Sequence, residues 1–399
     1  MKIVELLKKS DPAYRKHLWI FLVAYFLVLF NYPLIRASSI TLFFEAFGAK
    51  SSPAALFWSV AFLSVSIYTC NKLQAKFSVQ KVFLWASIFS VATFLISGIF
   101  KVAYVAFIWK EIYIVIQVHL LLAYANNFFK KEDFKVLVGP VGAAGSLGGI
   151  LGGLLTSAIS QHSGTLNVLW VGLLFVFVPA LFFLMTPSTR PANETTPKTS
   201  PLASLNDPLV RKYVFYIASV VALTQFMINI LDFKFNLAFE AAISDSSART
   251  SYLGGIYTWT NFATFLMQVF LLPYILPRVS DRNYHLFIPT SFLVCVTILM
   301  SGFGAGLMSV AVIYIYVKAA DYSLFSSGKE ILYQPLHPEQ KYGAKYLTDM
   351  LVYRTSKALV AAVLIYLQSS TILNVLMIVL LLFWMIMIIK LFTIHRKLN

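Results

Sequence analysis

The chain is poor in charged residues, and this lack defines its class. Only 12% of its 399 residues are Asp, Glu, Lys or Arg, whereas 59% are hydrophobic. A soluble domain usually carries about 25% charged residues. The composition therefore excludes an ordinary soluble globular protein and indicates a protein that is embedded in a membrane.

Cysteines and catalytic motifs are also scarce. The two cysteines, Cys70 and Cys295, lie far apart in or beside apolar stretches. Two cysteines cannot form a disulfide framework, so we interpret both as buried thiols. The sequence has no cluster of residues with metal-ligand spacing, no G-x-x-x-x-G-K-[ST] motif and no nucleophile elbow. These absences predict that the protein is not an enzyme and needs no metal or cofactor.

Long apolar stretches dominate the chain instead. A helix that spans a membrane needs about 20 mostly apolar residues, and about twelve such stretches can be counted. We expect the spans near residues 17–36, 54–71, 82–100, 103–125, 138–159, 165–185, 212–232, 250–274, 284–302, 304–323, 346–367 and 371–392. The prediction is an all-α polytopic membrane protein with twelve transmembrane helices.

The net charge of +16 has a regular distribution along the chain. Lys and Arg gather at the N-terminus and in every second loop, at 72–81, 130–135, 190–212, 278–282, 329–345 and 390–397. This alternation follows the positive-inside rule and predicts that both termini are cytoplasmic. Because orientation accounts for the basic residues, we expect no nucleic-acid partner.

The segment 186–211 is rich in Pro, Ser and Thr and divides the spans six and six. Its composition is typical of an exposed linker. We therefore predict an N-terminal half at 1–185, a cytoplasmic linker at 186–211 and a C-terminal half at 212–399. Six-plus-six repeats are the plan of the major facilitator superfamily, whose members bind substrate near the middle of the membrane between the halves and usually act as monomers.

Charged residues within spans are costly and mark functional positions. Cations outnumber carboxylates among them, which favours an anionic substrate, and Arg and Lys are natural partners of phosphate. The predicted substrate-binding residues are Arg36, Lys110, Lys234, Lys318 and Arg354. The predicted gating or proton-coupling residues are Glu111, His119, Asp232, Asp321 and Asp349.

Other interpretations of these charged residues, in which they neither bind substrate nor couple protons, stay open. Arg36, Asp232 and Lys234 come at the predicted ends of spans and could extend to the membrane surface. Opposite charges could form gating salt bridges, and His119 could be an ordinary buried, hydrogen-bonded histidine. The sequence does not separate substrate contacts from gates.

A glycine-rich segment, GPVGAAGSLGGILGG, occupies residues 139–153. Its spacing fits a phosphate-binding loop only in part, and no strand pattern precedes it. Gly145, Gly149 and Gly153 recur at every fourth residue in an apolar stretch. This spacing predicts a ridge of small residues through which two membrane helices pack closely.

Four segments carry a resemblance to a known family. They are FNYPLIRASSI at 30–40, WKEIYIVIQVHLLLAYANNFF with VGPVGAAGSLGGILGG at 109–153, ILDFKFNLAF at 230–239, and KEILYQPLHPEQKYGAKYLTDMLVYRTSKAL at 329–359. Together they resemble the ATP/ADP translocases of plastids and intracellular bacteria and their wider bacterial relatives. The last segment is the most specific, through Lys329, Tyr333, Lys345, Asp349 and Arg354.

The resemblance implies a facilitator-type protein of the bacterial inner membrane that exchanges a nucleotide or a phosphorylated metabolite by alternating access. Two alternatives remain at this stage. One is a proton-coupled exporter of a drug-like or siderophore-like molecule, and the other is a membrane scaffold or sensor that does not transport.

Overall fold

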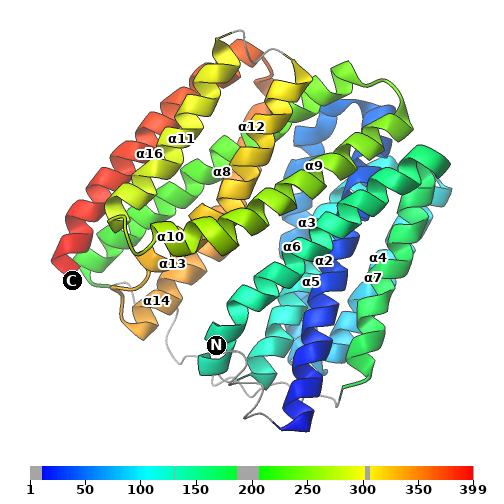
Figure 1. The fold of residues 1–399 in the computed structure, drawn as a ribbon, viewed down its shortest axis with the longest axis horizontal. Coiled ribbons are helices and arrows are strands. Elements are labelled where there is room, and N and C mark those ends of the chain that lie inside the picture. Colours follow the sequence, from blue (N-terminus) through cyan, green and yellow to red (C-terminus); the bar gives the residue numbers. More distant parts are fainter. Residues whose placement is uncertain (1–10, 130, 187–205, 302–305, 399) are drawn as a thin grey trace. The chain divides into compact units, whose positions relative to one another are not determined.

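The computed structural model describes residues 11–129, 131–186, 206–301 and 306–398. Within these ranges the chain is almost entirely helical and contains no strand (Figure 1). The prediction of an all-α fold is confirmed. Most of the predicted linker lies outside the described residues.

The first six long helices are numbered α2 to α7. They are α2 (Pro12–Phe47), α3 (Ser52–Gln74), α4 (Val79–Ile99), α5 (Ala103–Phe128), α6 (Lys131–Ser163) and α7 (Thr165–Leu184), with a short 3-10 turn at Ala49–Ser51. Helix α2 begins where the Asp11 carboxylate accepts a hydrogen bond from the Tyr14 amide and where Pro12 takes the first position. It ends at Gly48, whose φ of 73° suits glycine after a helix.

The second series runs from α8 to α16. Its helices are α8 (Pro208–Ala242), α9 (Ser246–Leu266), α10 (Leu272–Ile275), α11 (Asp281–Met300), α12 (Leu307–Ala320), α13 (Ser326–Leu332), α14 (Pro338–Lys345), α15 (Tyr353–Tyr366) and α16 (Ser370–Leu398). Three π-helical segments, Met267–Leu271, Asp321–Phe325 and Tyr346–Val352, join consecutive helices of this series. Such local widening of a helix occurs often at functional sites.

Ten stretches of the described chain are helices long and apolar enough to cross a membrane. They correspond to ten of the twelve predicted spans. The other two, 250–274 and 346–367, are helical as well, but a π-helical segment interrupts each. Helix α9 is also less apolar because Ser and Thr line the face that it turns to α6.

The helices extend further than the apolar stretches indicated. Arg36 and Asp232 were expected at the ends of spans, but α2 continues to Phe47 and α8 continues to Ala242. Residues such as Phe43 and Phe239 keep these extensions apolar and buried. Both charged side chains therefore lie inside long helices and not at helix ends.

The chain forms two compact units that differ from a simple division of the sequence. Unit 1 comprises residues 1–48, 61–194 and 243–262, and unit 2 comprises residues 49–60, 195–242 and 263–399. In unit 1, α2 packs on α5, α6 and α7, and in unit 2, α8 packs on α12, α15 and α16. The charged residues of α2 and α8 that are predicted to form the site therefore lie on the central helix of their unit.

Candidate functional site

Arg36, Lys110 and Glu111 form one buried cluster in unit 1. Glu111 Oε1 lies 2.7 Å from Lys110 Nζ and 3.2 Å from Arg36 Nη1. The side chains are 2% exposed for Lys110, 12% for Glu111 and 16% for Arg36. Helix α2 supplies Arg36 and α5 supplies the other two, so the packing of α2 on α5 creates the cluster.

Aromatic side chains surround the three charges. The Arg36 guanidinium donates hydrogen bonds to the hydroxyls of Tyr32 and Tyr257, the latter across 3.0 Å. Lys110 Nζ lies 3.7 Å from the centroid of the Phe107 ring. These contacts combine hydrogen bonds with cation–π attraction and hold both cations in place.

The balance of charge in this cluster is uneven. Both described ion pairs of Arg36 and Lys110 use the single carboxylate of Glu111, so the three side chains together carry a net positive charge. A surplus of cations in a low-dielectric interior attracts anions, so this cluster favours an anionic ligand.

A second ion pair lies in unit 2. Lys318 Nζ on α12 donates a hydrogen bond of 2.8 Å to Asp232 Oδ2 on α8, and the two side chains are 9% and 21% exposed. The other oxygen of Asp232, Oδ1, is buried and has no hydrogen-bond partner among the described residues. Asp321, in the π-helical segment after α12, interacts electrostatically with Lys318 and Asp232.

The aromatic surroundings of this pair resemble those of the first cluster. The Lys318 ammonium lies 5.6 Å from the centroid of the Tyr314 ring. Tyr314 stacks on Phe235 of α8, with centroids 4.3 Å apart and an angle of 19° between the rings. Each unit thus holds a buried lysine that pairs with a carboxylate and lies beside an aromatic ring.

The segment 329–349 forms a third network, at the ends of α13 and α14. Lys329 pairs with Asp349 at 2.7 Å, and Lys345 pairs with Glu330 at 2.6 Å. Tyr333 lies between the pairs, because its hydroxyl bonds to Asp349 Oδ1 at 3.4 Å and its ring lies under Lys345. This network accounts for the spacing of charged residues in the most specific sequence segment. Residues that are 15 to 20 positions apart in the sequence form its two ion pairs.

Three other predicted site residues lie elsewhere. Lys234 Nζ donates to Ser370 Oγ at 2.8 Å, at the start of α16. His119 bonds to Asn71 Oδ1 of α3 at 3.2 Å. Arg354 is half-buried on α15 and takes part in none of the ion pairs that the described residues form.

The glycine-rich segment lies within α6 and packs on two helices. A Cβ atom on Gly148 or Gly152 would collide with the backbone of Phe26 and Phe30 in α2. Gly149 and Gly153 face α9 instead, and a Cβ on Gly153 would lie 2.6 Å from the carbonyl oxygen of Gly254.

Hydroxyl groups continue this contact along α6 and α9. Ser157 Oγ donates to Ser251 O at 2.8 Å, and Ser160 Oγ donates to Ser247 O at 2.6 Å. Close backbone approach and hydrogen bonds between helices replace the hydrophobic effect as the cause of packing inside a membrane. Gly145 adds a looser contact, with Tyr25 of α2.

Sequence reasoning did not identify the aromatic partners of the clusters. Tyr32 lies one helical turn before Arg36, and this spacing alone could have indicated a contact. Tyr257 is 221 positions from Arg36 along the chain, so no local pattern could reveal it. Tyr113, whose fully buried hydroxyl has no hydrogen-bond partner among the described residues, interacts electrostatically with Arg36 and Glu111.

Known proteins similar to the chain are transporters. Residues 175–397 match the family model described as TLC ATP/ADP transporter. No curated protein matches the chain.

Solved structures similar to the chain share its fold at low sequence identity. The nucleoside transporter NupG is 12% identical, with a TM-score of 0.67, and the match covers 95% of this chain and 98% of that one. The POT family transporter PepTSo is 12% identical, with a TM-score of 0.67 and coverage of 98% and 99%. A bacterial homolog of the human lysosomal transporter Spinster, inward-facing and unoccupied, is 13% identical, with a TM-score of 0.61 and coverage of 98% and 99%.

Proposed function

The chain belongs to the TLC ATP/ADP transporter family and is an integral membrane transporter, and we propose that it carries a nucleotide or another phosphorylated metabolite by exchange. The family is one of transporters and not of enzymes. The substrate class and the exchange mechanism are the parts that we propose.

The observation that carries the proposal is the uneven charge of the Arg36–Lys110–Glu111 cluster. Two buried cations share one carboxylate, inside a helix bundle that crosses a membrane. Such an arrangement attracts an anion, because the three side chains together carry a net positive charge in a low-dielectric interior. Phosphate suits the guanidinium of Arg36, which offers several donors in a fixed plane.

In this proposal Glu111 holds both cations while the site is empty. A phosphate group would displace the carboxylate from Arg36 and Lys110, and the Tyr32 and Tyr257 hydroxyls would keep the guanidinium in position. In unit 2, Lys318 would bind an anion in the same way, and Asp232 would balance the charge of Lys318 when no anion is bound. Asp321 and Asp349 would act in gating.

Exchange follows from the same electrostatics. The empty cluster keeps its net positive charge, whereas the occupied cluster is neutralised. Moving between inward-open and outward-open states would then be easier for the loaded protein than for the empty one, since a bound anion lowers the net charge that is desolvated. A transporter with this property exchanges one anion for another.

Our further proposals concern organisation and orientation. We propose that residues 1–185 and 212–399 are the moving halves, joined by a linker at 186–211, and that the protein acts as a monomer. We also propose that both termini face the cytoplasm of a bacterium, on the basis of the alternating basic loops.

Uptake of radiolabelled ATP and ADP by proteoliposomes tests the proposal. We expect uptake into vesicles preloaded with unlabelled nucleotide and little uptake into empty vesicles. Equal uptake into both would contradict exchange and indicate ion-coupled import. No uptake into either, by protein with an intact melting transition, would contradict nucleotides as the substrate.

A further inference from the structure

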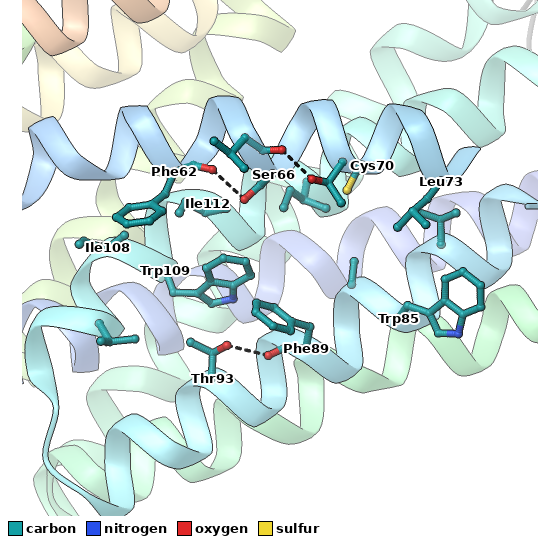
Figure 2. Close-up of a pocket in the computed structure, with 16 residues that line it drawn as sticks. Phe62, Ser66, Cys70, Leu73, Trp85, Phe89, Thr93, Ile108, Trp109 and Ile112 are labelled. Atoms are coloured by element: carbon teal, nitrogen blue, oxygen red, sulfur yellow. Dashed lines mark hydrogen bonds between the residues drawn. The ribbon is translucent and has the colours of Figure 1, made fainter. Parts of the chain in front are cut away.

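A long apolar groove lies in unit 1, apart from the charged cluster. Its volume is about 730 Å³, and α3, α4 and α5 line it. Figure 2 shows Phe62, Ser66 and Leu73 of α3 opposite Phe89 of α4 and Trp109 of α5. Its volume lies within the range of roughly 300–1,000 Å³ that is usual for pockets that bind small molecules.

Each of the three helices lines the groove with one of its faces, over the same number of residues. The lining runs from residue 62 to 73 on α3, from 82 to 93 on α4 and from 105 to 116 on α5. At 1.5 Å per residue, each face is about 16 Å long. That length is about half of the roughly 30 Å hydrocarbon core of a bilayer. The groove therefore has the length of a single membrane leaflet.

The groove offers almost no polar group to a ligand. The hydroxyls of Ser66, Thr69 and Thr93 donate hydrogen bonds to carbonyl oxygens of their own helices, at 2.8 to 2.9 Å. The remaining lining is aliphatic, aromatic or sulfur-containing, and its other donors are the indole N–H groups of Trp85 and Trp109. Such a surface offers water few partners, so the groove suits an apolar chain.

One end of the groove is strongly cationic. Leu73 and Val82, the lining residues at the turn between α3 and α4, are next in sequence to the exposed Lys72 and Lys81, and the exposed Lys76 lies in the turn itself. The sequence contains no Asp or Glu from residue 46 to residue 110. None of the ion pairs formed by the described residues involves these three lysines.

Exposed aromatic rings mark the same end. The Lys72 ammonium lies 5.5 Å from the Tyr68 ring centroid, and Phe77 packs edge-on against Trp85 with centroids 4.8 Å apart. Aromatic rings beside lysines are typical of the boundary between acyl chains and headgroups. An apolar groove of one leaflet's length thus ends at a cationic headgroup position.

We propose that this groove binds one phospholipid with an anionic headgroup. The acyl chain lies along α3, α4 and α5, and the headgroup phosphate contacts Lys72, Lys76 and Lys81. Three lysines close to a headgroup predict roughly a tenfold to hundredfold preference for an anionic over a zwitterionic lipid.

Native mass spectrometry of the purified full chain, titrated with phosphatidylglycerol or phosphatidylcholine of identical acyl chains, tests the proposal. We expect one tightly bound phosphatidylglycerol and at least tenfold weaker binding of phosphatidylcholine. Equal binding of the two lipids would overturn the anionic assignment. Labelling of Cys70, which lines the groove, should slow when phosphatidylglycerol is added, whereas labelling of Cys295 should not. Unchanged labelling of Cys70 would overturn the placement.

Two matched pairs of variants separate the groove from general effects. Thr69→Trp fills the groove, and Thr297→Trp places the same ring at another exposed threonine whose hydroxyl bonds to its own helix. We expect only Thr69→Trp to lose the bound lipid. The triple variant K72Q/K76Q/K81Q should bind both lipids equally, whereas K390Q/R396Q/K397Q should keep the preference. Retention of phosphatidylglycerol by Thr69→Trp at the wild-type level would overturn the proposal.

Discussion

Removing the shared carboxylate should destabilise the protein more than removing one of the cations that it serves. Glu111→Gln removes the carboxylate that both Arg36 and Lys110 contact. Lys110→Met leaves Arg36 and Glu111 as a balanced pair and places an apolar chain beside Phe107.

The expected magnitudes follow from the geometry. Breaking a buried pair so that a charge stays uncompensated costs about 3–5 kcal/mol. Loss of the 2.7 Å hydrogen bond between Lys110 and Glu111 costs about 1.5–3 kcal/mol. Lys110→Met also removes one of two like charges, so its cost should lie near the lower limit.

The assay is thermal unfolding in one detergent at constant ionic strength, followed by intrinsic tryptophan fluorescence. The melting temperature should fall in the order wild type, Lys110→Met, Glu111→Gln, and the exposed Lys212→Met should match wild type. Pyrophosphate should stabilise the wild type, by about 2.7 kcal/mol at one hundred times its Kd. It should stabilise Glu111→Gln still more, because removal of the Glu111 charge makes the cluster more positive.

Two results would refute this reasoning. One is a melting temperature for Lys110→Met at or below that of Glu111→Gln, which would mean that Lys110 does not give the cluster an excess of positive charge. The other is stabilisation by pyrophosphate that is the same in wild type, Lys110→Met and Glu111→Gln, which would place the anion site elsewhere.

Other predictions concern the helix contact and the second ion pair. Gly254→Ala places a Cβ 2.7 Å from a carbonyl oxygen of α6 and should cost about 1–3 kcal/mol of stability. The Cβ of Gly255→Ala meets open space, so this variant should gain about 0.5–1 kcal/mol of stability. Similar melting curves for the two variants would contradict the packing of α9 on α6. Asp232→Asn breaks the ion pair of the buried Lys318 and should cost about 3–5 kcal/mol. The double variant Asp232→Asn/Lys318→Met should recover most of that loss, and a double variant no more stable than the single one would contradict the pairing.

Much of the architecture could be predicted from the sequence because few backbone structures can satisfy their hydrogen bonds inside a membrane. An apolar stretch of sufficient length must form a helix, so hydropathy located the spans. It could not locate the helix ends, since apolar residues such as Phe43 continue α2 well beyond Arg36. The presence of π-helical segments in three of the predicted spans also has no signature in hydropathy.

The candidate site could be predicted only as a set of charges and not as an arrangement. Neighbouring charges on one helix can point to different partners: Asp232 meets Lys318, whereas Lys234, about 200° further round the helix, meets Ser370. His119 is about 80° round the helix from Glu111 and more than two turns along it, so it reaches Asn71 of α3 instead.

The contacts that unite distant segments lie beyond sequence reasoning without related sequences to compare. The spacing of Gly145, Gly149 and Gly153 indicates a packed helix but not the partner of each glycine. The structure shows that adjacent glycines serve different neighbours, with Gly148 facing α2 and Gly149 facing α9. One residue along a helix is about 100° of rotation, which is enough to change the partner.

The central claim is that the Arg36–Lys110–Glu111 cluster binds the transported anion. The most direct test measures the KM of nucleotide exchange in proteoliposomes for Arg36→Gln, Lys110→Gln and the exposed control Lys212→Gln, at equal reconstituted amounts. Losing one charged hydrogen bond to phosphate predicts a KM raised about tenfold to a hundredfold in the first two variants, with Lys212→Gln unchanged. Wild-type KM values in both cluster variants would contradict the claim and move the anion site away from this cluster.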